Sequence, residues 1–457
     1  MKKKALLLAI LLLVATVTSC ASDGPVLKDF IRNMENETAD LGGRTVLFGV
    51  SAITEDGLIP LQDSTSAMSD AQRKLIKNVE ERLHCVVEQD VFDKDALAAS
   101  IGSFNCKFDL LYDHTGNQID LVKAGLLHDL NTFEVLDLSN VNKWGTAQDQ
   151  LHRTYQGKVF GVKPRSAAST YTSLEGVMMV NDSLIKTFGQ PTPKELFEQG
   201  NWTFDYFTDY VVKVSDMKAD EPIYGMSYYN GQLSQLPLTA IFANGSSLLQ
   251  NSNSGSLSFN LMKDPKAVAA LDWAQEVYET GVLKEEDAAT NSNTFISGRS
   301  SLWLGGAWVG TSNRPGYPLQ EMSSGFSFFH MPYGPDAEYG KTYSSFIFVS
   351  RSLVVPVSSD EYEMGCFLNE FCAELSEEEL DLLKYEAQTE YFFNEEDYNL
   401  LIDMADNAVY TYLYAELNDV RDKILTALDS ITKGKTSISE SIGAIEGRVS
   451  EELKKIK

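Results

Sequence analysis

Long apolar runs and clustered metal ligands are scarce in this chain of 457 residues. After residue 17, no apolar run reaches the roughly 20 residues that a membrane-spanning helix needs. The five histidines are His84, His114, His128, His152 and His330. They form no cluster at metal-ligand spacing, so we expect no metal centre and no other cofactor.

Positive charge is also in short supply. The chain has 38 basic and 65 acidic residues, which gives a formal net charge of −27. Such a surface repels nucleic-acid phosphates and anionic lipid headgroups, so both are disfavoured as partners. Hydrophobic residues make up 43% of the chain, which is enough to fill the cores of two or three domains.

Cysteine is equally rare, and we expect four of the five cysteines to be buried free thiols. Cys366 and Cys372 share a stretch with helical periodicity, where six residues separate them by about 9 Å on nearly opposite faces. Cys85 and Cys106 lie near the starts of two predicted strands. They could form a disulfide only if those strands were neighbours.

The first twenty residues have the composition of a secretory leader. Three lysines precede an apolar run from Ala5 to Val17, and the run ends at Val-Thr-Ser-Cys-Ala. This end resembles a bacterial lipobox, which would make Cys20 the lipidated first residue of the mature chain. The alternative is an ordinary cleaved signal with a chance cysteine. Residues 21–43 are polar and rich in small residues, as expected of a tether.

From residue 44, strand and helix patterns alternate at the spacing of βαβ units. RTVLFGVSA, CVVEQDVF and FDLLYD are predicted strands. A helical stripe that Asp70 could cap follows the first of them, and DALAASI and QIDLVKAG follow the others. The pattern predicts a mainly parallel sheet covered by helices on both faces. Ligands bind such sheets beyond the carboxyl ends of the strands, so residues 51–55 and 113–116 are candidate positions.

Further along, capping residues mark helices with clear ends. Asp264 and Pro265 begin one helix and Gly281 ends it, while Ser437 and Glu440 form a capping box before the last one. We interpret Trp202 and Trp273 as core residues.

GRSSLWLGGAWVG (298–310) reads as a buried strand that ends at two glycines. Leu302 and Leu304 share one face and Trp303 takes the other, so Trp303 is expected to pack in the core. The glycine pair would let the chain bend and leave room for a ligand beside the backbone. Trp308, beyond the bend, would then be free to line a binding site.

Four segments follow one another in a recognisable order: FDLLYDHTGNQIDLVKAGLLHDL, YQGKVFGVKP, GVMMVNDSLIKTFGQPTPKELFEQGNWTFDYF and FISGRSSLWLGGAW. This order resembles the carbohydrate-type extracellular solute-binding proteins of ABC importers, the maltose-binding-protein-like group. The chain departs from the family pattern at Ser301-Leu302, at Asp129 and at Val180-Asn181-Asp182.

The resemblance implies an α/β, two-lobed periplasmic-binding-protein-like (type II) fold with mixed, mainly parallel sheets and a ligand cleft between the lobes. The first lobe would comprise residues 44–164 and 343–405, and the second residues 165–342, with the C-terminal helices (406–457) mostly joining the second lobe. In this topology the second and third strands flank the first, which would separate Cys85 from Cys106. The implied protein is a monomer on the outer face of the cell membrane. Its partners would be a sugar or oligosaccharide and the permease subunits of an importer, and the lipid on Cys20 would be its only membrane contact.

A neutral sugar needs an aromatic plate for its C–H face and paired polar groups for its hydroxyls. Trp308 matches the family tryptophan that stacks on sugar. The other candidate ligand-binding residues are Asp113, His114, Asn244, Tyr171, Tyr343 and Ser51. Each of them could instead be a turn or core residue.

Other functions remain open from the sequence. Ser183–Lys186 and Ser215–Lys218 fit the Ser-x-x-Lys pattern of penicillin-recognising enzymes, but no Lys-Thr-Gly follows. Among so many acids, any two could be taken for a glycoside hydrolase pair. The same fold could bind a peptide or polyamine, and an adhesive surface lipoprotein is a further class. We expect a binding protein without enzymatic activity.

Overall fold

The computed structural model describes residues 39–53, 58–63, 67–144, 153–163, 173–229, 231–251, 257–286, 293–311, 324–341, 344–347, 351–374, 394–413 and 417–455, with a few single positions between them. Cys20, Tyr171 and Tyr343 lie outside these residues, so their predicted roles stay predictions. Among the described residues, no helix is both long and apolar enough to cross a membrane.

The first lobe is built on a four-stranded sheet in the order β15-β3-β1-β2. Its strands are β1 (Thr45–Val50), β2 (Val86–Val91), β3 (Leu110–His114) and β15 (Arg351–Val354). β1 pairs in parallel with both β2 and β3, whereas β15 runs antiparallel to β3. Thus β2 and β3 flank β1, as expected.

Five helices belong to the first lobe: α3 (Ala67–Leu83), α4 (Lys94–Gly102), α5 (Thr115–Lys123), α6 (Val141–Trp144) and α14 (Glu361–Phe371). The predicted alternation of strand and helix is confirmed. One boundary was wrong, because α3 begins at Ala67 and leaves Asp70 inside the first turn instead of at the cap.

The four described cysteines are free, which confirms the prediction that they form no disulfide. Cys85, Cys366 and Cys372 are buried as expected, but Cys106 is only half-buried. The difference arises because Cys106 precedes β3 in an irregular segment at the margin of the sheet instead of lying within a strand.

The second lobe contains a five-stranded mixed sheet in the order β11-β8-β12-β7-β13. The strands are β7 (Val177–Val180), β8 (Tyr224–Tyr229), β11 (Leu283–Glu286), β12 (Ser300–Gly305) and β13 (Ser327–Phe329). β11, β8 and β12 are parallel, so their carboxyl ends meet at one edge. β7 runs antiparallel to β12 and β13.

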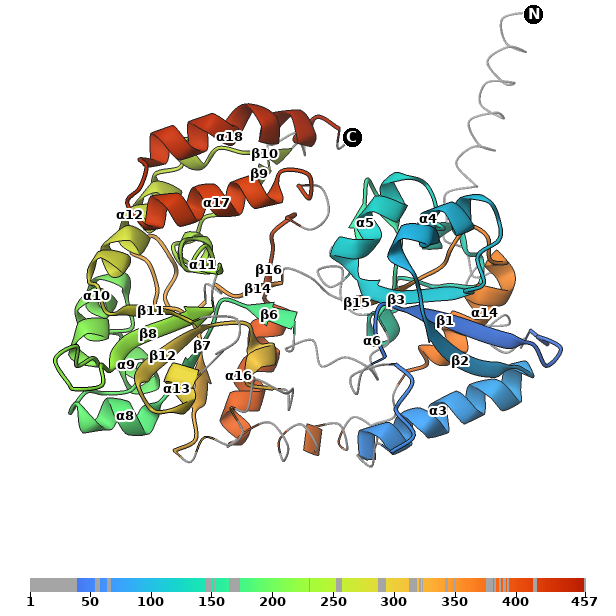
Figure 1. Ribbon diagram of the computed structural model, residues 1–457, viewed down its shortest axis with the longest axis horizontal. Coiled ribbons are helices and arrows are strands. Elements are labelled where there is room, and N and C mark those ends of the chain that lie inside the picture. Colours follow the sequence, from blue (N-terminus) through green and yellow to red (C-terminus); the bar gives the residue numbers. More distant parts are fainter. Residues whose placement is uncertain are drawn as a thin grey trace, which may run out of the picture.

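Helices cover this second sheet on both sides (Figure 1). Those that come before its last strand are α8 (Asp182–Thr187), α9 (Pro193–Glu198), α10 (Phe204–Lys213), α11 (Gln235–Ala243), α12 (Pro265–Glu279) and α13 (Asn293–Ile296). The later ones are α16 (Glu395–Asp406), α17 (Arg421–Thr432) and α18 (Ile438–Leu453). Asp264 caps α12 with Pro265 in its first turn, and Ser437 caps α18, as predicted.

A small third sheet, in the order β16-β14-β6, lies between the two main sheets (Figure 1). Its strands are β6 (Leu174–Glu175), β14 (Phe346–Ile347) and β16 (Val409–Tyr410). The described segments on either side of three ranges belong to different lobes or to the small sheet between them. The chain therefore passes between the lobes three times, between residues 163 and 173, between 347 and 351, and between 374 and 394. Two-residue hairpin strands β4 (Thr154–Tyr155) and β5 (Lys158–Val159) precede the first passage. β9 (Gln250–Asn251) and β10 (Leu257–Ser258) form another hairpin.

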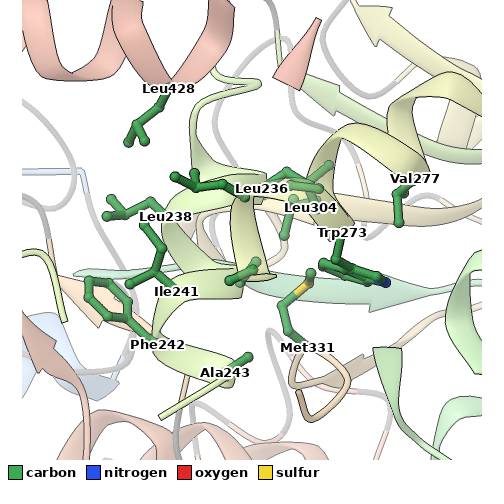
Figure 2. Packing of buried hydrophobic residues seen from close by; sticks show 14 of the residues in the cluster. Leu236, Leu238, Ile241, Phe242, Ala243, Trp273, Val277, Leu304, Met331 and Leu428 are labelled. Atoms are coloured by element: carbon green, nitrogen blue, oxygen red, sulfur yellow. The ribbon is translucent and has the colours of Figure 1, made fainter. Parts of the chain in front are cut away.

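The largest core cluster fills the second lobe around α11 and α12. Figure 2 shows Trp273 of α12 beside Leu304 of β12 and Met331, with side chains of α11 such as Ile241 packed nearby. Trp202 belongs to the same cluster and is fully buried, so both tryptophans are core residues as predicted.

The chain between 343 and 405 is shared between the lobes instead of belonging to the first. β15 and α14 do complete the first lobe, with α14 packed against α3. β14 joins the small sheet, and α16 packs against β13 of the second lobe. The expected boundary was wrong because the amphipathic pattern of α16 predicts that one face of the helix is buried but does not indicate which lobe it packs against.

Candidate functional site

In the first lobe, three predicted site residues meet at the carboxyl end of β3. The Ser51 hydroxyl donates to Asp113 Oδ1 over 2.9 Å, and the His114 backbone N–H donates to the same oxygen over 2.8 Å. Asn117 Nδ2 donates to Asp113 Oδ2 over 3.0 Å. Asp113 is buried, whereas Ser51 and His114 are half-buried. Asp113 therefore organises this edge, and Ser51 and His114 are its more exposed members.

Arg351 adds a cation to the same edge. It pairs with His114 across β15 and β3, and its Nε donates to His114 Nε2 over 3.5 Å. The side chain is half-buried. A cation next to a hydroxyl and an imidazole gives this lobe a polar, hydrogen-bonding surface.

In the second lobe, Trp308 lies in a 3₁₀ turn (Ala307–Val309) directly after β12. Its indole is half-buried, and Nε1 donates to Glu175 Oε1 over 3.2 Å. Glu175 ends β6 of the small sheet, so this hydrogen bond ties Trp308 to the region where the chain passes between the lobes. The indole is positioned by a polar contact as well as by packing.

Glu175 is a buried carboxyl with two hydrogen-bond donors. Gln235 Nε2, at the start of α11, donates to Glu175 Oε2 over 2.8 Å and to Gln232 Oε1 over 2.6 Å. Burial raises the pKa of Glu175 to about 7, and the hydrogen bonds from Gln235 and Trp308 only partly offset this rise. Gln235 Oε1 is buried and has no partner among the described residues.

The glycine pair at the end of β12 makes room for two indoles and not for a ligand, which corrects the expectation. A Cβ on Gly306 would lie 2.1 Å from Trp308 Nε1 and 2.8 Å from Glu175 Oε2. A Cβ on Gly305 would lie 2.7 Å from Trp303 Nε1. Each glycine lets a nearby tryptophan fold back over the backbone. A side chain at 306 would displace Trp308 from Glu175.

Trp303 lies on the opposite face of β12 from Leu302 and Leu304, as predicted. It is fully buried in a cluster with Met179 and Phe328, whereas the two leucines belong to the core around α11 and α12. Trp303 is therefore a packing residue.

Asn244 is not at the site, which corrects another prediction. It ends α11 at the far end of the helix from Gln235. Its Nδ2 donates to the Lys266 carbonyl over 2.9 Å, and its Oδ1 accepts the Asp336 N–H over 2.9 Å. Because both ends of the buried amide are occupied, Asn244 holds a loop together instead of meeting a ligand.

Three residues of the candidate site were missed: Glu175, Gln235 and Arg351. Glu175 had a weak signal, as a lone acid followed by a glycine and a run of apolar residues, in LEGVMMV. Gly176 has a φ of +70° and turns the chain directly after Glu175. Gln235 and Arg351 had no comparable signal, because only the tertiary fold brings them to these strand ends.

Replacing Glu175 with glutamine is expected to flatten the pH dependence of stability. The folded-state pKa of about 7 lies above the ordinary 4.5, so the folded protein holds this proton between those pH values while the unfolded chain loses it. Stability from this group therefore falls as pH rises from about 4.5 to 7, by a total of about 3 kcal/mol. Thermal melts of both proteins from pH 5 to pH 8 measure the difference.

The comparison between variant and wild type cancels other buried groups that titrate in this range. Asp397, whose pKa burial raises to about 7, contributes with the same sign. His330, whose pKa burial lowers to about 4, contributes with the opposite sign. Parallel melting curves for wild type and Glu175→Gln would contradict the prediction.

The two half-sites lie close to the same passage between lobes. Ile347 of β14 pairs with Leu174, the neighbour of Glu175. Arg351 follows Ile347 by only four residues, so their Cα atoms are at most about 14 Å apart. A hydroxyl–imidazole–guanidinium surface on one lobe thus lies near an indole–carboxyl pair on the other.

Several solved structures share the fold of this chain. The cyclic α-maltosyl-1,6-maltose binding protein of Arthrobacter globiformis matches 91% of this chain with 100% of its own, at 15% identity and a TM-score of 0.63. An ABC transporter solute-binding protein from Thermotoga lettingae, bound with α-D-tagatose, matches 90% of this chain with 100% of its own, at 15% identity and a TM-score of 0.56. This chain has the two-lobed solute-binding-protein fold.

A third solved structure with the same fold contains a different ligand. UgpB from Mycobacterium tuberculosis, in complex with glycerophosphocholine, matches 91% of this chain with 99% of its own, at 14% identity and a TM-score of 0.59. No family model and no curated protein matches the sequence. The predicted fold class, two α/β lobes with mixed sheets, is confirmed.

Proposed function

We propose that this protein is the extracytoplasmic solute-binding component of an ABC importer and that it captures a sugar or oligosaccharide between its lobes. One observation carries the proposal. Strand ends of the two lobes present complementary half-sites, with Trp308 held by Glu175 on one side and Ser51, His114 and Arg351 on the other.

The chemistry of the two half-sites suits a saccharide. An indole face takes the C–H face of a sugar ring, and hydroxyl, imidazole and guanidinium groups take its hydroxyls. The structural neighbours support the proposal, because their descriptions name maltodextrin-type sugars and tagatose. A polyamine is disfavoured, because Arg351 would repel a cation.

A thermal-shift screen against mono- and oligosaccharides tests the proposal. A ligand that binds only the native state raises the melting temperature by mass action. We expect at least one sugar to raise it in a concentration-dependent way, with a dissociation constant confirmed by calorimetry. If no saccharide shifts the melt while peptides or polyamines do, the fold serves another solute.

We also propose that the mature protein is attached to the outer face of the cell membrane through lipid on Cys20. Replacing Cys20 with alanine is expected to move the protein from the membrane fraction to the soluble fraction, because it removes the thiol that receives the lipid. Immunoblots of the two fractions measure the distribution, and continued membrane retention of the variant would contradict the proposal. Cys106→Ala, which alters a half-buried thiol of the folded lobe, serves as the matched control.

A further inference from the structure

Arg351 is the first described residue after Ile347 of the small sheet, and it begins β15 of the first lobe. Its register places it opposite His114, at the carboxyl end of β3. This is the same edge at which Ser51 and Asp113 meet. The guanidinium therefore belongs to the candidate binding surface of the first lobe.

Among the described residues, the guanidinium of Arg351 has no acidic partner. Arg44, Arg82 and Arg299 each pair with a carboxylate, as expected in a chain with 65 acidic residues. Within the described part of the chain, the hydrogen bond to His114 is the contact that Arg351 makes, and no carboxylate lies within 4 Å of it. A half-buried guanidinium is well suited to binding a carboxylate or phosphate, which it can engage with two parallel hydrogen bonds.

The nearby carboxylate of Asp113 is already occupied. It accepts hydrogen bonds from the Ser51 hydroxyl, the His114 N–H and the Asn117 amide. α5 begins at Thr115, so the positive end of its dipole lies at this edge as well. These contacts satisfy Asp113 locally and leave the charge of Arg351 available to a ligand.

The half-site on the other lobe does not oppose an anionic ligand. Trp308 contributes a half-buried, uncharged indole. Glu175 lies buried and is held by Trp308 and Gln235, so its carboxyl is directed toward protein donors. A saccharide could stack on Trp308 and direct a charged substituent toward Arg351.

We propose that the solute is an acidic sugar, whose carboxylate or phosphate group binds Arg351 while a ring stacks on Trp308. The inference rests on the proposed function and adds the charge of the ligand. Uronic acids and sugar phosphates both carry an anionic group that a guanidinium can bind, so the experiment includes both kinds of sugar.

Calorimetry on the full mature chain tests the inference with matched sugars. The pairs are glucose with glucuronate, galactose with galacturonate, α-1,4-galactobiose with digalacturonate, and glucose with glucose 6-phosphate. For wild type we expect at least one acidic member to bind tenfold or more tightly than its neutral partner. This preference should shrink in 0.5 M NaCl, because salt screens an exposed charge contact.

Arg351→Gln should abolish the preference. Affinity for the neutral member should fall modestly, because a sugar hydroxyl loses a hydrogen bond from the guanidinium, and affinity for the acidic member should fall at least tenfold further, because its charge partner is gone. Arg448→Gln is the matched control, because Arg448 is exposed on α18, far from the strand ends. It should bind as wild type does. Circular dichroism melts verify that both variants fold. If Arg351→Gln does not fold, the acidic preference of the wild type and its response to salt test the inference.

Each other outcome is informative. Neutral sugars that bind as tightly as their acidic partners, or an acidic preference that survives in Arg351→Gln, would overturn the inference while the proposed function stands. If neither acidic nor neutral sugars bind, the proposed function fails and the inference fails with it. Binding of uronates alone or of the phosphate alone identifies the anionic group.

Discussion

Replacing Trp308 with alanine is expected to weaken sugar binding ten- to hundredfold. In the proposed site the half-buried indole supplies the aromatic surface of the second half-site, and losing such a contact costs about 1.5–3 kcal/mol of binding free energy. Stability should fall by only about 1 kcal/mol, because Glu175 loses one of its two donors and keeps Gln235. Calorimetry and thermal melts of the ligand-free protein measure the two effects separately.

A phenylalanine at position 308 separates stacking from hydrogen bonding. It keeps an aromatic face but removes the N–H that reaches Glu175. We expect Trp308→Phe to retain most of the affinity that the alanine variant loses. If Trp308→Ala binds normally while the ligand-free protein melts early, the indole is packing and the assigned half-site is wrong.

Trp303→Ala is expected to destabilise the fold by about 3–5 kcal/mol and to leave the intrinsic affinity for sugar unchanged. The side chain is fully buried, and a close-packed core fills the volume of a lost indole only in part. Its Nε1 has no hydrogen-bond partner in the described structure, so the loss comes from packing alone. The urea midpoint of unfolding measures the change.

Trp303→Phe provides the matched control for this core position. It keeps an aromatic ring against Met179 and Phe328 and should lose less than half as much stability. The two tryptophans, five residues apart, would thus separate stability from affinity. A normal urea midpoint for Trp303→Ala, or a loss of affinity at temperatures where it is folded, would contradict the assignment.

The sequence predicted elements whose signals are local. α12 has its cap, its proline and its final glycine within one continuous stretch, and β1, β2 and β3 alternate with helices at a regular spacing. The faces of β12 follow from the two-residue period of a strand. Ser51, Asp113 and His114 were predicted as site residues because α/β sheets bind ligands at strand ends, and the structure places the three together.

The rest of the site depends on contacts between distant residues. Glu175 ends a strand of two residues, which is too short to show a periodic pattern. Its partners Gln235 and Trp308 lie 60 and 133 residues further along the chain. Asn244 was predicted as a ligand-binding residue because an amide beside aromatic residues is typical of a sugar site. In the structure its amide forms hydrogen bonds with backbone groups instead.

The three passages between the lobes also determine how the protein can fold. The first sheet stays incomplete until β15 has been made, which is after all five strands of the second sheet. Pairing β15 with β3 closes a loop of more than 230 residues, and such non-local pairing slows folding. Neither lobe is a continuous segment, so a protease cut between them should leave fragments that cannot refold alone. The first lobe can therefore complete its sheet only after the strands of the second lobe have been synthesised.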